Sequence, residues 1–472
     1  MINTLDTICA ISTPPGVGGI AVIRVSGPRA FEAVQKIWRG KDLSVVPHAS
    51  ASVGEIIDGD MMLDQAVATV FRAPRSYTSY DTVEISVHGS VYIQSRLLRL
   101  IVDTGLCRMA EPGEYTRLAY LAGRMDLAQV EAVADILSAQ TAGAHNIAIH
   151  QLRGGLTDCI RDLRDRLVEL ASLLELELDF SEEDVEFASR SSLEQLLMHI
   201  IQQIDKLTDS FSTGQAILSG FPIVLAGATN AGKSTLFNLL IGDDRAIVSD
   251  IHGTTRDMIQ DTFSIGETLF RITDTAGLRN TSDPIEREGI NRACKVIHNA
   301  CLILWLNGHN TTYDEIRQIW EQLKPNISKN QILLPIITKI DTVAPGENIS
   351  HVEKKIRILP GIEDVTLETP LFHTTKDSAT LHTLREAIIR VARPYTTYNP
   401  GETIITNERQ RQALIQAKET LKLTQETLAS GYPPDLVAHH LRDATSYLAT
   451  ITGDITTPDI LSNIFSRFCI GK

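Results

Sequence analysis

Eight residues from Gly227 to Ser234 (GATNAGKS) have the composition and spacing of a phosphate-binding loop. In such a loop the glycines let successive backbone N–H groups turn toward bound phosphates, and the next helix adds partial positive charge at its N-terminus. Lys233 can reach the terminal phosphates, and the hydroxyl of Ser234 can ligate magnesium. The loop therefore predicts a site for a nucleoside triphosphate and Mg²⁺, formed by Asn230, Ala231, Gly232, Lys233, Ser234 and Thr235.

Two further polar segments follow the loop in the order that a GTPase requires. In the first, Thr254 or Thr255 can offer a hydroxyl to magnesium and an N–H to the terminal phosphate, and position favours Thr255. In the second, Asp274 can hold a magnesium-bound water, and the amide of Gly277 can approach the terminal phosphate. The intervening Thr275 and Ala276 are assigned to the same nucleotide site, and Arg256 is a candidate for stabilising charge during hydrolysis.

The residues Thr338, Lys339 and Asp341 select guanine as the base. The carboxylate of Asp341 can accept hydrogen bonds from both N1–H and the exocyclic amine of guanine, and adenine has no matching pair of donors. The usual GTPase motif is Asn-Lys-x-Asp, and Thr338 stands here in place of the Asn. Threonine keeps a hydrogen-bonding oxygen but lacks the amide donor. A later segment, Phe372–Lys376, stands where GTPases carry Ser-Ala-Lys and departs from that pattern. An ATP-binding phosphate-loop protein is the alternative, and competition between ATP and GTP distinguishes the two.

Apolar runs of strand length precede the phosphate loop, the segment with Asp274 and the segment with Thr338, and a further run lies between the last two. They predict a Ras-like domain with a mixed, mostly parallel sheet. The predicted strands are 221–226, 268–273, 301–306 and 331–337, and a helix is predicted over 234–241.

The composition limits which classes of protein this chain can belong to. A length of 472 residues suffices for about three domains, and a net charge of −14 gives no global basic field of the kind that dedicated nucleic-acid binders use. No apolar run reaches about 18 residues and no basic-then-apolar leader is present, so we expect a soluble cytoplasmic protein without membrane association. The six cysteines have no C-x-x-C spacing, which argues against a disulfide framework and against a zinc site.

Changes of pattern along the chain predict four segments. We expect an α/β domain over residues 1–122, because β-rich runs occur at 7–12, 20–26, 66–71 and 82–87. Helical patterning covers 123–215, including 127–137 and 159–176, and it returns over 381–472 after the nucleotide domain at 216–380. A helical region that stops, admits a nucleotide domain and resumes indicates an insertion into one discontinuous all-helical domain.

Four features of the chain together resemble the MnmE (TrmE) family of tRNA-modifying GTPases over nearly its whole length. They are TPPGVGGI at 13–20, EPGEYT at 111–116 with RMDLAQ at 124–129, Asn230 with GTTRD at 253–257, and the terminal CIGK at 469–472. This combination is far more specific than the GTPase motifs alone.

The resemblance implies an activity. Such proteins act with an FAD-containing partner, MnmG (GidA), on carbon 5 of the wobble uridine (U34) of certain tRNAs, and they add an aminomethyl or carboxymethylaminomethyl group. A folate, 5-formyl- or methylene-tetrahydrofolate, is the implied one-carbon source. The N-terminal domain is expected to bind that folate and to mediate a homodimer, which with MnmG would form a heterotetramer.

The family's folate site maps by position onto Arg24, Glu84, Arg124 and Lys472. The chemistry is sensible, because a carboxylate can accept the amide–amine edge of a pterin, and cationic side chains suit its glutamate tail. Taken singly, each of these residues is more simply an ordinary surface charge. Cys469 of the terminal motif is a candidate thiol in the modification, either as a nucleophile or as a residue that shapes the ligand site.

The residue after Gly277 is Leu278, which cannot orient water as the glutamine of Ras-type GTPases does. The resemblance implies instead a K⁺ ion, held when two GTPase domains meet face to face, that neutralises charge on the phosphates. Glu286 matches the family's water-orienting position, although a carboxylate at a helix start is the simpler explanation. The implied K⁺ ligands are Asn230, Ser249, Ile251 and Thr254, and the same loop adds Asp250, His252 and Gly253 to the GTP site.

Two other functions share the nucleotide module. A ribosome-assembly GTPase typically carries an appended basic RNA-binding domain, which this acidic chain lacks. A non-catalytic switch would bind partners according to nucleotide state, and fast intrinsic hydrolysis would argue against it.

Overall fold

A computed structural model describes residues 6–179, 190–242, 260–274, 294, 296–343, 350–375, 377–399, 401–430, 432, 434–466 and 468–471. The chain divides into two compact units, each made of segments that are separated in sequence. The first unit comprises residues 1–134, 151–193 and 419–472, and the second comprises 135–150 and 194–418.

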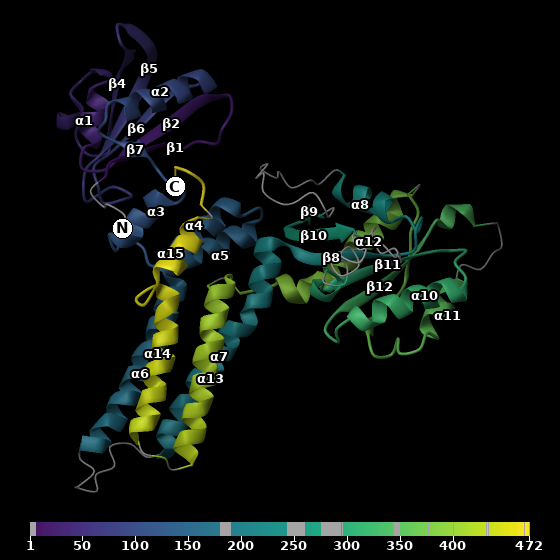
Figure 1. Cartoon of the computed structure of the whole chain (residues 1–472). Helices are drawn as coiled ribbons and strands as arrows, with labels where there is room; N and C mark the ends of the chain where they lie inside the picture. Colours follow the sequence, from purple (N-terminus) through teal and green to yellow (C-terminus); the bar gives the residue numbers. More distant parts are fainter. Residues whose placement is uncertain are drawn as a thin grey trace, which may run out of the picture. The chain divides into compact units, whose positions relative to one another are not determined.

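A seven-stranded sheet forms the N-terminal part of the first unit (Figure 1), and its strand order is β3-β4-β5-β6-β2-β1-β7. All neighbours are antiparallel except β1 and β7. The strands are β1 (Ile8–Ile11), β2 (Gly18–Ser26), β3 (Trp38–Gly40), β4 (Ser50–Asp58), β5 (Met61–Phe71), β6 (Thr82–Gly89) and β7 (Arg108–Met109). The four predicted runs are therefore strands, whereas β3, β4 and β7 were not predicted.

One face of this sheet carries the apolar core, and helices α1 (Ala30–Gln35) and α2 (Val91–Asp103) contribute to it. Alternate residues of β5, namely Ala66, Ala68 and Val70, are buried, as expected for a strand with one face on a core. Leu97 and Ile101 of α2 pack against the same core.

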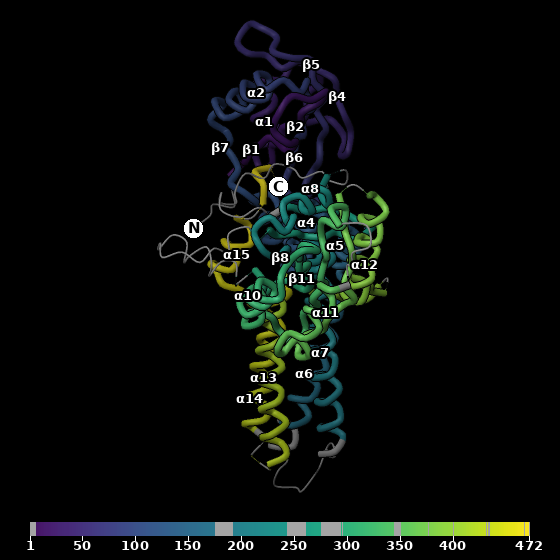
Figure 2. The backbone as a smooth tube through the Cα atoms, turned by 90° about the vertical axis from the view of Figure 1, so that its right-hand side faces the viewer, coloured from purple at the N-terminus to yellow at the C-terminus, as the bar shows by residue number. Residues whose placement is uncertain are grey.

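Helices complete the first unit. The helices α3 (Glu114–Leu121) and α4 (Leu127–Ser138) follow the sheet, and α6 (Gly155–Asp179) packs against α14 (Pro434–Thr452), as both Figure 1 and Figure 2 show. The short α15 (Pro458–Phe465) leads to the C-terminus, where Phe465 and Phe468 pack on Val130 of α4. The helical patterns predicted at 127–137 and 159–176 are confirmed.

The second unit contains a mixed sheet of order β13-β12-β11-β8-β10-β9, in which β14 also pairs with β12. Only β9 and β10 are antiparallel; the other pairs are parallel. The strands are β8 (Phe221–Gly227), β9 (Gln260–Ile265), β10 (Thr268–Asp274), β11 (Leu302–Gly308), β12 (Ile332–Thr338), β13 (Thr366–Leu367) and β14 (Leu371–Phe372). The predicted mixed, mostly parallel sheet is confirmed.

Helices cover both faces of this sheet (Figure 1). The helices α8 (Lys233–Ile241) and α12 (Ser378–Thr396) pack on one face, and α10 (Tyr313–Leu323) and α11 (Ser350–Arg357) pack on the other. The predicted domain boundary at 380 falls near the start of α12, whose Leu384, Ile388 and Val391 join the core of the sheet. We therefore propose that the nucleotide domain extends to about residue 396. The remaining helices are α5 (Ala142–Leu152), α7 (Arg190–Ser219) and α13 (Glu408–Ala429).

Within the described part of the chain, no helix combines the length and the apolar character needed to cross a membrane.

Candidate functional sites

The phosphate loop lies between β8 and α8, as the sequence predicts. Gly227 has φ of +144°, and a side chain there would overlap the carbonyl oxygen of Leu306 on the neighbouring strand. Gly232 adopts a left-handed conformation with φ of +97° directly before Lys233 opens the helix. The glycines are therefore required by the path of the loop, whose N–H groups lie at a helix N-terminus suited to phosphate.

Lys233 folds back over this loop. Its Nζ donates to the carbonyl oxygens of Gly227 at 2.9 Å and Ala228 at 2.8 Å. Burial lowers the pKa of Lys233, and the nearby carboxylate of Asp274 opposes that shift. The ammonium group is thus held where the terminal phosphates of a bound nucleotide would compete for it.

Ser234 and Asp274 meet at the end of β8 and β10. The parallel register pairs Asp274 of β10 with Leu225 of β8. The Asp274 carboxylate and the loop that follows β8 therefore both lie at the carboxyl edge of the sheet. The Ser234 hydroxyl donates to Oδ2 of Asp274 at 3.3 Å. A hydroxyl and a carboxylate at this separation are hard oxygen donors of the kind that Mg²⁺ binds through direct contacts and water, so the pair fits the predicted magnesium site.

Thr338 ties the base-binding strand to the phosphate loop. Its buried hydroxyl donates to the carbonyl oxygen of Ala231 at 2.8 Å and lies 3.3 Å from that of Asn307. A threonine therefore makes a direct link to the loop even though it lacks the amide of the usual asparagine. Lys339 follows with a left-handed φ of +61°, which turns the chain toward Asp341.

Asp341 is oriented by Thr374, which the sequence pattern did not identify as a contact. The Thr374 hydroxyl donates to Oδ1 of Asp341 at 2.8 Å. Thr380 in turn holds Thr374. The backbone N–H of Thr374 donates to the Thr380 hydroxyl, and that hydroxyl donates to the backbone carbonyl oxygen of Thr374. The segment that departs from Ser-Ala-Lys thus still supplies a hydroxyl to the carboxylate that is predicted to bind guanine. No sequence motif identifies this contact; it follows from the place of Thr374 just after β14 in the folded chain.

Many predicted residues lie outside the described residues and stay predictions. They are Ser249, Asp250, Ile251, His252, Gly253, Thr254, Thr255, Arg256, Thr275, Ala276, Gly277, Glu286, Lys376 and Lys472.

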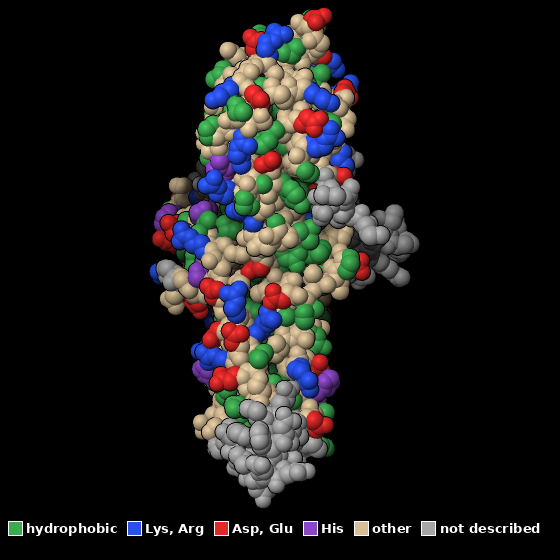
Figure 3. Space-filling model, turned by 90° about the vertical axis from the view of Figure 1, so that its left-hand side faces the viewer, with side chains coloured by type: hydrophobic (Ala, Val, Ile, Leu, Met, Phe, Trp, Pro, Cys, Tyr) green, Lys and Arg blue, Asp and Glu red, His purple; other side chains and the backbone are tan. Residues whose placement is uncertain are grey.

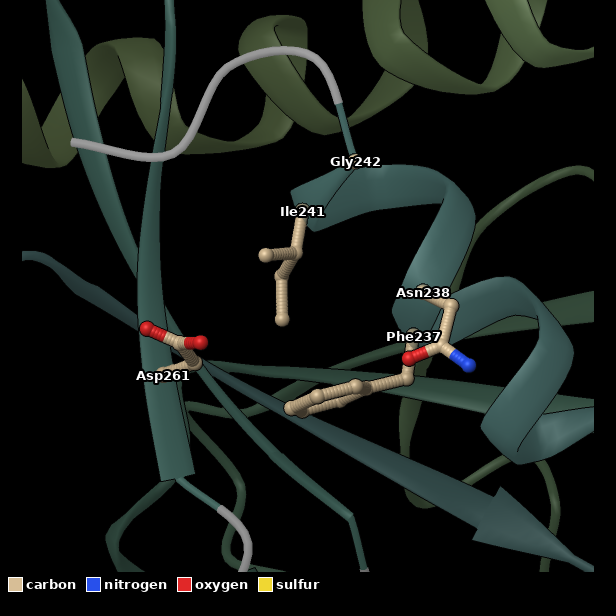
Figure 4. Close-up of a pocket in the computed structure, with 5 residues that line it drawn as sticks. All are labelled: Phe237, Asn238, Ile241, Gly242 and Asp261. Carbon is tan, nitrogen blue, oxygen red and sulfur yellow. The ribbon is translucent and has the colours of Figure 1, made fainter.

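A pocket of about 200 Å³ opens at the far end of α8, away from the phosphate loop (Figure 4). Phe237 and Ile241 of α8 and Asp261 of β9 line it, together with Asn238 and Gly242. None of these residues belongs to the predicted nucleotide site.

The first unit brings together a second group of predicted residues. Arg24 of β2 and Glu84 of β6 are directly paired in the sheet, and their side chains form an ion pair with N–O distances of 2.8 and 2.9 Å. The Arg24 guanidinium lies 5.9 Å from the ring of Tyr77 and 5.4 Å from that of Tyr115. Arg124 donates to the carbonyl oxygen of Pro74, in the loop that carries Tyr77.

The C-terminal motif lies against the same strands. The carbonyl oxygen of Gly471 accepts from Nη1 of Arg24 at 3.3 Å and from the Ser12 hydroxyl at 3.4 Å. The N–H of Gly113, in the EPGEYT segment, donates to the carbonyl oxygen of Cys469 at 3.5 Å. The Cys469 side chain is exposed. Segments from both ends of the chain therefore lie in contact.

Known proteins are similar to this chain over nearly its whole length. The sequence model described as "GTP-binding protein TrmE N-terminus" matches residues 7–124, and that of the "MnmE helical domain" matches residues 127–469. A tRNA modification GTPase MnmE of Parabacteroides distasonis is 42% identical over 480 residues, covering 99% of this chain and 100% of the relative. That of Bacteroides thetaiotaomicron is 41% identical over 472 residues, covering 99% of each chain.

The chain belongs to the MnmE family of tRNA modification GTPases. This MnmE-family protein is accordingly a GTP hydrolase, and the site at the edge of the second sheet is where its nucleotide motifs meet. Among solved structures, Era of Aquifex aeolicus bound to GDP·AlF4⁻ has 23% sequence identity and a TM-score of 0.28, and it covers 43% of this chain and 66% of its own. That likeness is too partial to bear on function.

Proposed function

We propose that this protein uses GTP hydrolysis to drive the addition of an aminomethyl or carboxymethylaminomethyl group to C5 of the wobble uridine of certain tRNAs. The observation that carries the proposal is the meeting of Arg24, Glu84 and the Cys469–Gly471 segment at one place in the first unit. A GTPase that served only as a switch has no need of such a site. The family membership of the chain supports the same chemistry.

The proposed one-carbon donor is 5-formyl- or methylene-tetrahydrofolate. The donor set fits it, because the Glu84 carboxylate can accept the amide–amine edge of a pterin while Tyr77 and Tyr115 present aromatic rings beside Arg24. Arg124 and Lys472 are the proposed cations for the glutamate tail. Folate binding would require Glu84 to exchange part of its ion pair with Arg24 for the ligand. Cys469 is the proposed thiol of this site, and its exposure leaves it accessible to substrate.

In the nucleotide site, Mg²⁺ would be held by Ser234 and Thr255, and the charge of the phosphates would be offset by Lys233. We propose that K⁺, bound through Asn230, Ser249, Ile251 and Thr254, supplies the further positive charge in the face-to-face pair of GTPase domains. Asn230 has a left-handed φ of +65° within the phosphate loop. Turnover of GTP in potassium and sodium buffers tests this step, and equal rates would exclude it.

The proposed assembly is a cytoplasmic homodimer, joined through the N-terminal domain, that forms a heterotetramer with the FAD-containing MnmG. A partner would also help to attract tRNA, because the chain carries a net charge of −14. On the face drawn in Figure 3, basic and acidic side chains are interspersed and do not form a field of one sign.

The decisive experiment is nucleoside analysis of tRNA from cells that lack this protein and from the same cells complemented with variants. We expect the modified wobble uridine to disappear on deletion and to return with the wild-type chain. Glu84→Gln should fail to restore it while GTP turnover of the purified variant stays unchanged. The matched control is Glu55→Gln, which alters an exposed pair with Arg39 in the same sheet. An unchanged nucleoside profile in the deletion strain would refute the proposal.

A further inference from the structure

Two of the six cysteines meet inside the N-terminal sheet. Cys9 lies in β1 and Cys107 directly precedes β7, and their Sγ atoms are 3.7 Å apart although 98 residues separate them in sequence. The parallel pairing of β1 with β7 places Cys9 opposite Met109, and Cys107 lies two residues before Met109, so both cysteines face the same side of the sheet. Cys9 is completely buried and Cys107 is half-buried.

Both thiols also contact nearby backbone carbonyl groups. The Cys9 thiol donates to the carbonyl oxygen of Arg108 at 3.5 Å, and the Cys107 thiol lies 3.4 Å from that of Ile101. Both side chains also pack on the apolar core between the sheet and α2. Neither cysteine has a role in the GTP site or in the proposed modification chemistry.

The environments of the two thiols differ in a way that assigns their chemical roles. The hydrogen bond with Cys107, together with burial, raises the pKa of Cys9 far above its usual range. The same hydrogen bond lowers the pKa of Cys107, although burial opposes the shift. Cys107 is also the more exposed of the two thiols, so a small oxidant reaches it first.

We propose that Cys9 and Cys107 are a reversible oxidation site, in which a hydroperoxide converts the two thiols into a disulfide. The Cys107 thiolate attacks one peroxide oxygen, the O–O bond breaks, and the leaving oxygen takes up a proton to depart as water or alcohol. The resulting sulfenic acid on Cys107 is then attacked by the sulfur of Cys9, which loses its proton as the sulfenic oxygen leaves as water. The two thiols supply two electrons, and the peroxide takes them up.

The geometry permits this bond. A disulfide has an S–S length of about 2.05 Å, so the sulfur atoms must approach by roughly 1.7 Å. β7 is already hydrogen-bonded to β1, so this approach comes from rotation of the two cysteine side chains and from the segment that directly precedes β7, which belongs to no strand. A disulfide in an intracellular protein is typically of this reversible kind rather than a structural bridge.

Peptide mapping tests the proposal on the full-length protein. Reduced protein is treated with hydrogen peroxide, blocked with N-ethylmaleimide and digested with trypsin without reductant. Cleavage after Arg24, Arg99 and Arg108 places Cys9 alone in residues 1–24 and Cys107 alone in residues 100–108. We expect these two peptides to be linked in most molecules and to separate on treatment with dithiothreitol.

Variants identify the roles of the two thiols. The exposed Cys469 gives the matched control, because Cys469→Ser should leave the linked peptide unchanged. Cys107→Ser should abolish it. Cys9→Ala should leave Cys107 as a sulfenic acid, detected as at least a threefold gain in dimedone labelling. Peroxide treatment of the wild-type protein that yields only sulfinic acid on Cys107, or a link between Cys107 and another cysteine, would overturn the proposal.

Discussion

Replacing Thr374 with valine removes one hydroxyl group at nearly constant side-chain volume. The hydroxyl lost is the donor to Oδ1 of Asp341 at 2.8 Å, and Thr374 is only 7% exposed. A hydrogen bond to a charged group contributes about 1.5–3 kcal/mol. Asp341 is itself exposed, so water can replace part of the lost interaction and the lower end of that range applies. A loss of about 1.5 kcal/mol corresponds to roughly tenfold weaker binding of GDP or GTP.

The assay is a fluorescence titration with GDP and with inosine diphosphate at fixed Mg²⁺ concentration. Inosine lacks the exocyclic amine of guanine, so Asp341 makes one bond fewer to it, and we expect a smaller loss of affinity for this nucleotide. The ratio of GDP to inosine diphosphate affinity should therefore fall in Thr374→Val. The adjacent Thr375 is exposed, and Thr375→Val is the matched control.

Two results would refute this reasoning about the guanine site. One is a GDP dissociation constant within twofold of the wild-type value. The other is an equal loss of affinity for both nucleotides, because it would mean that Thr374 supports the fold of the site and does not orient the carboxylate that reads the base.

Three other substitutions test contacts that the structure describes. Thr338→Val removes a buried hydrogen bond to the carbonyl oxygen of Ala231, so the free energy of unfolding measured in urea should fall by about 1–2 kcal/mol. GDP binding should also weaken, and unchanged binding would contradict the link to the phosphate loop. Gly113→Ala puts a side chain at φ of +68° and against the carbonyl oxygen of Phe465, so it should lower the free energy of unfolding by about 2 kcal/mol or more. The C-terminal helix α15 should then become accessible to limited proteolysis, and an unchanged digestion pattern would disprove this. Burial raises the pKa of Glu114, but hydrogen bonds and ion pairs with two arginines outweigh it and hold the pKa below its usual range. Its contribution to stability is therefore full above about pH 4.3 and lost as the pH falls below that value, and Glu114→Gln should remove this part of the acid dependence in urea titrations between about pH 3 and 6.

Some elements could not be predicted because their sequences carry little pattern. Ile56 is the one buried side chain of β4 in a stretch of small and polar residues, so this strand exists mainly through its pairing with β5. By contrast, β8, β11 and β12 are continuous apolar runs that are buried on both faces, and the sequence predicts them within two residues at each end.

The sequence by itself determined the phosphate loop, the choice of guanine and the family, because these depend on contiguous residues whose backbone conformation is local. Gly227 and Gly232 are examples, since the positive φ angles that the loop needs are open to glycine. Only the tertiary structure decided that Thr374 orients Asp341, that Gly471 meets Arg24, and that Cys107 faces Cys9. These pairs are 33, 447 and 98 residues apart, and strand register and the return of the C-terminus, not spacing along the chain, bring their atoms into contact.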